Sequence, residues 1–221
     1  MSRCILSVSL LALIAGGCGD KQSSQTQSYN QTATQTKPIV SVVPVIDNTK
    51  NTYDWSLSDE LSSALYYRLS QQDRLFLVDA PRVRAKTKKL GEGQNPFGPD
   101  ISWVKKNFHG DEFVVFLELV EHEEVLKQDR KRPSAQENCS ADLNMSMRVR
   151  VFDLRGTEPK VVLQELIHDT HFIPRQFTHI NFHQVAWGDE SFNISPMGLA
   201  HSEFTKEIAS RLSDYIQMAA K

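Results

Sequence analysis

The stretch FVVFLELV, residues 113–120, is the most apolar run in the chain beyond its first eighteen residues. Glu118 is its only polar residue, and the others are β-branched, aromatic or leucine. A run this short and this apolar is typical of a strand buried on both faces. We therefore expect residues 113–120 to form the central strand of a sheet, around which the rest of the chain is arranged.

A strand, a helix and a second strand are predicted on the N-terminal side of this run. Residues 39–43 are mostly β-branched and end at Pro44, which indicates a buried strand. Leucine then recurs at spacing four after a capping serine, Ser56: Leu57, Leu61, Leu65 and Leu69. This spacing predicts an amphipathic helix. Residues 74–78 (RLFLV) predict the next strand, and the order strand, helix, strand implies a right-handed parallel crossover.

Two short helices and two long strands are predicted next. Residues 81–89 form a basic segment that fits a short helix, and residues 101–108 fit another with Trp103 and Val104 turned inward. Charged residues from 121 to 132 predict an exposed turn. Apolar and polar residues then alternate from 141 to 151, which predicts a strand with one wet face. A hairpin turn at 156–159 leads to an antiparallel neighbour over residues 161–172.

The last predicted element is a helix capped by Ser195. Its apolar residues recur at spacings of three and four: Phe204, Ile208, Leu212, Tyr215 and Ile216. We expect it to pack across the sheet. The predicted fold class is therefore α/β (α+β), with one mixed sheet of about five strands, a parallel βαβ start, a long antiparallel hairpin and a C-terminal helix packed on the sheet.

The first seventeen residues have the features of a signal peptide. Arg3 is followed by an apolar run over residues 5–14 and by Ala15-Gly16-Gly17, directly before Cys18. The apolar run is much shorter than the ~20 residues that span a bilayer. The segment resembles the lipobox of bacterial lipoproteins, although Ala15 departs from the usual aliphatic residue. That resemblance implies that Cys18 becomes the N-terminus and carries lipid such as palmitate.

The lipobox resemblance also implies a location. Gly19 rather than aspartate follows Cys18, which favours anchoring in the outer membrane with the protein facing the periplasm. Residues 18–37 are rich in Gln, Ser and Thr and predict a disordered tether, with a mean reach of about 24 Å. We expect residues 38–221 to form a single periplasmic α/β domain.

Composition argues against several partners. Lys+Arg 25 and Asp+Glu 27 give a net charge of −2, which provides no field to attract nucleic acid. Neither GxGxxG nor GxxxxGK[ST] is present, so no nucleotide and no cofactor are expected. Cys139 shares its odd parity with the apolar residues of the strand at 141–151, so we expect this thiol to be buried in the core.

Four histidines are the only weak candidates for a metal site: His168, His171, His179 and His183. His168 and His171 have opposite parity on a strand, and the alternation around His179 and His183 indicates extended chain. No HExxH motif is present. Surface or hydrogen-bonded histidines are the favoured interpretation, and no metal is expected. Ser191 and Ser195 lack a GxSxG context, so no catalytic triad with His168 and Asp169 is expected either.

Two surfaces are candidates for contact with a partner. The first is the basic segment, with Arg82, Arg84, Lys86, Lys88 and Lys89. It fits anionic lipid headgroups or an acidic partner, or alternatively a solvated helix face. The second is an apolar loop with Trp187 and Phe192, which fits either a binding patch or a cover for the edge of the core.

Three short motifs carry a wider resemblance: VVPVI at 42–46, RLFLVD at 74–79 and HGDEFVV at 109–115. With the order of elements, they resemble the periplasmic α/β domain of the curli-secretion lipoprotein family, of the N-terminal domain of the Tol-system propeller protein and of penicillin-binding-protein activator lipoproteins. The whole chain also resembles an uncharacterised chlamydial lipoprotein family. These resemblances imply an envelope lipoprotein.

The leading functional hypothesis is a non-enzymatic envelope lipoprotein that binds another envelope protein and is held in the outer-membrane bilayer through acylated Cys18. The alternative is a subunit of an outer-membrane secretion or assembly channel. Charges in the long hairpin disfavour that alternative: Arg148, Arg150, Glu165 and Asp169. A third, weaker hypothesis is a metal-dependent enzyme that uses the histidines.

Overall fold

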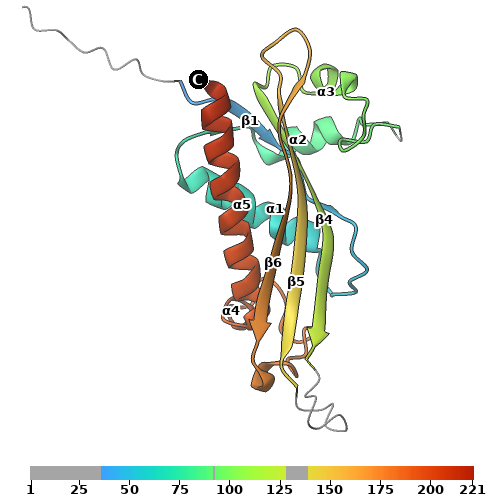
Figure 1. Ribbon diagram of the computed structural model, residues 1–221, viewed down its shortest axis with the longest axis vertical. Helices are drawn as coiled ribbons and strands as arrows, with labels where there is room; N and C mark the ends of the chain where they lie inside the picture. The colour runs from blue at the N-terminus through green and yellow to red at the C-terminus, as the bar shows by residue number, and fades with distance from the viewer. Residues whose placement is uncertain (1–35, 92, 128–138) are drawn as a thin grey trace, which may run out of the picture. The chain divides into compact units, whose positions relative to one another are not determined.

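The computed structural model describes residues 36–91, 93–127 and 139–221, and those from Thr36 onward belong to one unit. The predicted signal peptide, Cys18 and almost all of the predicted tether lie outside the described residues. The elements follow one another along the chain in Figure 1 as β1 (Ile39–Val42), β2 (Ile46–Asp47), α1 (Leu57–Gln71), β3 (Phe76–Leu77), α2 (Ala80–Thr87), α3 (Ser102–Asn107), β4 (Phe113–Leu126), β5 (Ala141–Asp153), β6 (Lys160–Ile173), the 3₁₀ helix η2 (Arg175–Phe177), α4 (Glu190–Asn193) and α5 (Pro196–Ala220).

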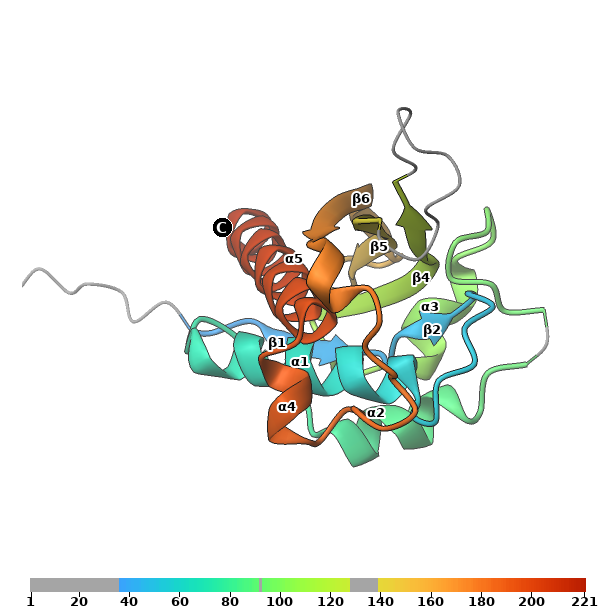
Figure 2. The ribbon, with the colours of Figure 1, turned by 90° about the horizontal axis from the view of Figure 1, so that it is seen from below.

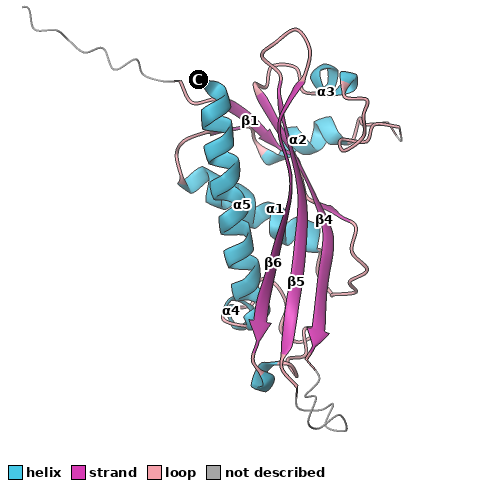
Figure 3. Cartoon of the chain, viewed as in Figure 1, coloured by secondary structure: helices cyan, strands magenta, loops and turns pink. Residues whose placement is uncertain are grey.

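The strands form one mixed sheet in the order β3-β1-β4-β5-β6, and β2 pairs with β4 (Figure 3). β1 runs parallel to both β3 and β4, whereas β4, β5 and β6 are antiparallel. The central place of β4 follows from its apolar residues, because only a strand with neighbours on both sides and cover on both faces can bury all of them. The predicted fold class is confirmed.

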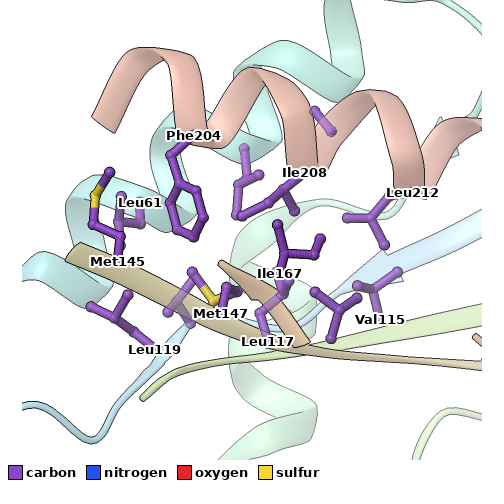
Figure 4. Close-up of a cluster of buried hydrophobic side chains, with 14 of the residues drawn as sticks. Leu61, Val115, Leu117, Leu119, Met145, Met147, Ile167, Phe204, Ile208 and Leu212 are labelled. Carbon is purple, nitrogen blue, oxygen red and sulfur yellow. The ribbon is translucent and has the colours of Figure 1, made fainter. Parts of the chain in front are cut away.

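One face of the sheet, here called the core face, packs against α1 and α5. The four leucines of α1 at spacing four are all buried, and the side chain of Ser56 caps the helix by accepting a hydrogen bond from the backbone N–H of Asp59. In Figure 4, Phe204, Ile208 and Leu212 of α5 lie over side chains of β4, β5 and β6. The C-terminal helix therefore packs on the sheet as predicted. Tyr215 is an exception, since it falls beside the buried stripe and stays exposed.

The other face of the sheet, here called the second face, lies opposite α1 and α5, which are side by side in Figure 2. Among the residues that the structure describes, it is covered only near the start of β4. There, Phe116 makes edge-to-face contacts with Phe108, Trp103 and Phe152. Trp103 and Val104 are buried, as predicted for the helix that became α3. We call this region, with Val114, Phe116, Arg150 and Phe152, the covered half.

β4 is longer than predicted, because residues 121–126 continue the strand and do not form an exposed turn. They pair with β5 as far as Ala141, and these cross-strand pairs outweigh the charges that suggested a turn. The register shifts between Leu119 and Glu121, which marks a β-bulge at Val120. After the bulge, His122 faces the core opposite Met145, while Glu121 lies on the second face.

The remainder of the second face extends from Glu118 to Val125 on β4, with the neighbouring parts of β5 and β6. Neither α2 nor α3 reaches this region, which we call the bare half (Figure 1). Leu166 is 59% exposed and Phe172 53% exposed on its outer strand, β6. Within the described ranges, β6 pairs with β5 alone, so it is an edge strand. No helix in the part of the chain that the structure describes is both long and apolar enough to cross a membrane.

Candidate functional site

The four predicted histidines do not form a cluster, and three of them have separate partners. His168 on β6 is 2.9 Å from the hydroxyl of Ser146, and His171 is 3.9 Å from a carboxylate oxygen of Glu203 on α5. His183 lies 3.0 Å from Asp54, and His179 is exposed. Across residues 36–91, 93–127 and 139–221, no three His, Cys, Asp or Glu side chains are grouped in a way that could hold a metal ion.

The interpretation of residues 179–183 as extended chain is wrong, because they lie in turns. Asn181 explains the difference. Its side-chain oxygen accepts a hydrogen bond from the backbone N–H of His183, and its backbone carbonyl accepts one from Val185. Such side-chain bonds to nearby backbone groups favour turns over strands.

The basic segment forms α2, but two of its five cations are engaged within the chain. Lys86 is 2.6 Å from Asp111, and its side chain is only 13% exposed, while Arg84 is 3.1 Å from Asp59. The buried carboxylate of Asp111 requires the charge of Lys86 as compensation, and a contact of Lys86 with a partner stays a prediction. Three others remain exposed: Arg82, Lys88 and Lys89.

The two residues of the predicted apolar loop separate in the structure. Trp187 is 39% exposed, but Phe192 is 2% exposed and makes edge-to-face contacts with Trp55 and His201. Its backbone lies against Gly198, where an added Cβ would come within 2.0 Å of the Phe192 carbonyl oxygen. Phe192 is therefore a core residue, which fits the alternative that this loop covers the edge of the core, and a contact of the loop with a partner stays a prediction.

The described residues also contain a buried polar chain that the sequence did not predict. The indole N–H of Trp55 donates to Glu60 Oε2 at 2.7 Å, and Glu60 Oε1 lies 2.6 Å from His201 Nδ1. His201 Nε2 is in turn 2.7 Å from Nε2 of His122. Both histidines and Glu60 are almost completely buried. This chain links α1, α5 and β4, so it fixes both covering helices to the central strand.

Protons in this chain can be assigned from the geometry. Glu60 accepts a hydrogen bond from Nδ1 of His201, so that nitrogen carries a proton. One further proton lies between Nε2 of His201 and Nε2 of His122. Burial, with His201 as a second cause, lowers the pKa of His122 to about 3, so His122 is neutral near pH 7. Its Nδ1 is buried and has no hydrogen-bond partner in the described residues.

Aromatic rings seal the chain from solvent. Tyr53 stacks on Trp55 with ring centroids 4.7 Å apart and meets His122 edge-on at 5.7 Å. Burial, followed by the charges of Glu124 and Glu60, raises the pKa of Tyr53 to about 12. Asn51 donates to the backbone carbonyl of His122, beside a surface hollow of about 440 Å³. The bonds of the polar chain join α1 to α5 and α5 to β4, so the chain serves as a buried polar tie between elements.

One part of this chain could have been found in the sequence. His201 lies three and four residues before Phe204 and Thr205, on the stripe that α5 buries. A histidine on such a stripe requires a buried partner. His122 gives no comparable signal, because the bulge at Val120 reverses the alternation that precedes it.

A comparison with protein families identifies the chain. A family model described as a family of unknown function, DUF7499, matches residues 25–220. The chain belongs to this family. Among curated proteins, no match is found.

Several solved structures of bacterial proteins are similar to this chain. It is similar to the hypothetical protein CT253 from Chlamydia trachomatis, with 26% identity and a TM-score of 0.63 over 81% of this chain and 98% of that one. Lower similarity is found to lipoprotein GNA1162 from Neisseria meningitidis (11% identity, TM-score 0.40, 78% and 99% covered). The minor lipoprotein from Acinetobacter baumannii gives 9% identity and a TM-score of 0.39, with 82% and 93% covered.

These comparisons bear on the expected resemblances. The fold shared with CT253 confirms the likeness to a chlamydial protein, and lipoproteins are among the structures that match. The finer resemblances, to the curli-secretion, Tol and penicillin-binding-protein activator families, stay predictions.

Proposed function

We propose that this protein is a lipid-anchored lipoprotein of the bacterial envelope whose folded part binds another envelope protein and catalyses no reaction. The observation that carries the binding role is the open edge of β6 beside the bare half. The anchor that we propose is Cys18, because it follows the lipobox-like segment. The location that we propose is the periplasmic side of the outer membrane, because Gly19 rather than aspartate follows Cys18.

An edge strand offers a protein partner two kinds of contact. β6 has fourteen residues, and its backbone groups on the side away from β5 have no neighbouring strand among the described elements. Such groups can pair with an added strand. Leu166 and Phe172 lie on the same face of β6 and are exposed, so they would bury apolar surface against the same partner.

The distribution of titratable groups supports binding over catalysis. The residues with the largest pKa shifts are His122, which belongs to the buried polar chain, and Tyr53, whose ring packs against that chain. Catalytic acids and bases need contact with substrate. On the bare half, the Ser146 hydroxyl donates to Glu121 at 2.6 Å, so it links Glu121 to His168 and is not poised as a nucleophile toward the histidine.

Site-specific photo-crosslinking in cells tests the binding role. A photoreactive amino acid is placed at Leu166 or Phe172, with Tyr67 on α1 as a control position that is 64% exposed. We expect one discrete crosslinked protein from the two β6 positions and none from position 67. Crosslinking that is equal at all three positions, or absent at both β6 positions, would contradict the proposal.

A further inference from the structure

Two separate elements bring basic side chains around one hollow. Arg82, Lys86 and Lys89 lie at helical spacing on one side of α2 and its C-terminal turn. Lys106 from α3 and His109, just beyond that helix, face them across a hollow of about 400 Å³. Sequence reasoning identified the α2 residues but not Lys106 and His109.

Among the residues that the structure describes, no acidic side chain lines this hollow. Asp111 lies behind the hollow, and its Oδ2 already accepts hydrogen bonds from Lys86 at 2.6 Å and from the Ser41 hydroxyl at 2.7 Å. The positive charges of Arg82, Lys89 and Lys106 therefore stand together on a chain whose net charge is −2.

Asp100 does little to offset Lys106. The pKa of Asp100 is lowered chiefly by hydrogen bonds from the Ser102 side chain and backbone, and Lys106 is the smallest contributor. An anionic ligand in the hollow would therefore meet three cations that form no ion pair within the described residues, with Asp100 near Lys106 as a further, exposed charge.

The hollow lies at the end of the sheet where the N-terminal segment joins the folded part. β1 and β4 are parallel, so both begin at this end. Ile39, the first residue of β1, donates its N–H to the Glu112 carboxylate at 2.7 Å, and Ser41 reaches Asp111. Figure 1 shows the start of β1 and α3 at the same end of the sheet.

We propose that this hollow binds the anionic headgroups of the phospholipid surface to which the chain is anchored. The inference rests on the proposed function only for the anchor at Cys18. Lysine and arginine near an anionic membrane each strengthen partitioning by about fivefold. The cations are spread over two helices around an open hollow, which suits several headgroup phosphates of a lipid layer.

A domain held in this way would be oriented as well as tethered. β4 starts at the basic end and has fourteen residues, each of which adds ~3.3 Å to its length. With β4 directed away from the membrane, the far end of the bare half would lie ~40 Å from the lipid surface. The exposed residues of β6 from Leu166 to Phe172, which we propose for protein binding, would then lie toward the end of that strand that is farther from the membrane.

Vesicle cosedimentation tests the proposal with the chain from residue 18 onward carrying Cys18→Ser, which cannot be acylated. It is mixed at low salt with vesicles of phosphatidylcholine alone or of phosphatidylcholine and phosphatidylglycerol. We expect binding only to the anionic vesicles, and at least about tenfold weaker binding for the double variant K89E/K106E. The control K50E/K206E reverses two exposed lysines elsewhere and should weaken binding less than about twofold.

Three results would overturn the proposal. These are no preference for anionic vesicles, an equal loss in both double variants, or release by inorganic phosphate but not by chloride at matched ionic strength, which would indicate a site for free phosphate. Circular dichroism of each variant confirms that it is folded. Fatty-acid labelling of Cys18 is a separate measurement, so a failure of the anchor and a failure of the basic hollow are distinguishable.

Discussion

The covered and bare halves of the second face are built on the same strands, yet two arginines of β5 show how differently they are used. Arg150, in the covered half, is 9% exposed and donates from Nη1 to the carbonyls of Pro96 at 2.9 Å and Gly98 at 2.7 Å. Arg148, two positions earlier, lies in the bare half and forms an ion pair with Glu118 at 2.9 Å. Arg150 holds the covering loop by two hydrogen bonds. Arg148 is 46% exposed, pairs with the nearly buried carboxylate of Glu118 and reaches the same loop only through a contact with the ring of Phe97, 5.3 Å away.

The difference comes from what lies over the strand. Alternation along β5 decides which residues point away from the core, but the segment between α2 and β4 decides which of these are buried. Its aromatic residues cover Phe116 and Phe152, and its loop covers Arg150, whose pKa burial lowers. The same wet face thus contains a second small core and a surface available for binding.

Phe116→Ala against Phe172→Ala should give the largest contrast. Phe116 is completely buried among three aromatic rings, so its truncation should lower the free energy of unfolding by about 3–5 kcal/mol. Phe172 is exposed and contacts Lys127, so its truncation should cost less than about 1 kcal/mol. Urea denaturation of both variants measures the contrast, and similar midpoints would show that the covered half is not a core.

The pH dependence of stability should separate His122 on the core face from His168 on the bare half. The pKa of His122 is about 3 in the folded chain and near its ordinary 6.5 in the unfolded chain, so the unfolded chain binds the extra proton. Above pH 6.5 His122 is neutral in both states and does not lower the free energy of unfolding. As the pH falls from 6.5 toward 3, protonation of His122 in the unfolded chain lowers the free energy of unfolding progressively. At pH 4.5 the loss should be on the order of 2–3 kcal/mol.

His122→Gln should remove much of this acid sensitivity, and His168→Gln, which removes a 53% exposed imidazole from the bare half, is the matched control. Urea midpoints measured between pH 7.5 and 4.5 for the three proteins provide the comparison. Parallel curves for His122→Gln and the unsubstituted chain would show that other groups control the acid response.

Arg150→Ala against Arg148→Ala should give the smallest of the three contrasts. Removing Arg150 leaves two carbonyls of the covering loop without their donor, at an expected cost of about 1–3 kcal/mol. The Arg148 side chain is 46% exposed, and its nearly buried partner Glu118 keeps a hydrogen bond from Asn48 when Arg148 is removed. The loss of Arg148 should therefore cost at most about 1 kcal/mol. Thermal unfolding of the two variants measures the difference, and a larger effect at Arg148 would refute the assigned roles.

Local patterns in the sequence were sufficient to predict most of the elements. The leucines of α1 and the run at 113–120 are placed as expected, because spacing and hydrophobicity act over a few residues. The sequence did not show which polar residues meet across the fold. Lys86 pairs with Asp111, twenty-five positions away in the sequence, and His122 bonds to His201, seventy-nine positions away. Such pairs depend on how whole elements are packed, which no local pattern records.

The β-bulge at Val120 determines how β4 would respond to the deletion or insertion of one residue. Counted without it, strict alternation from Phe113 would point Glu121 and Glu123 inward and His122 outward, so this one extra residue decides whether carboxylates or an imidazole occupy the interior. Loss of the Val120 codon is a change in length that the strand should absorb, because the residues on either side keep their faces. Gain of a codon just after it would instead turn the far end of β4 over and act like several core substitutions made at once.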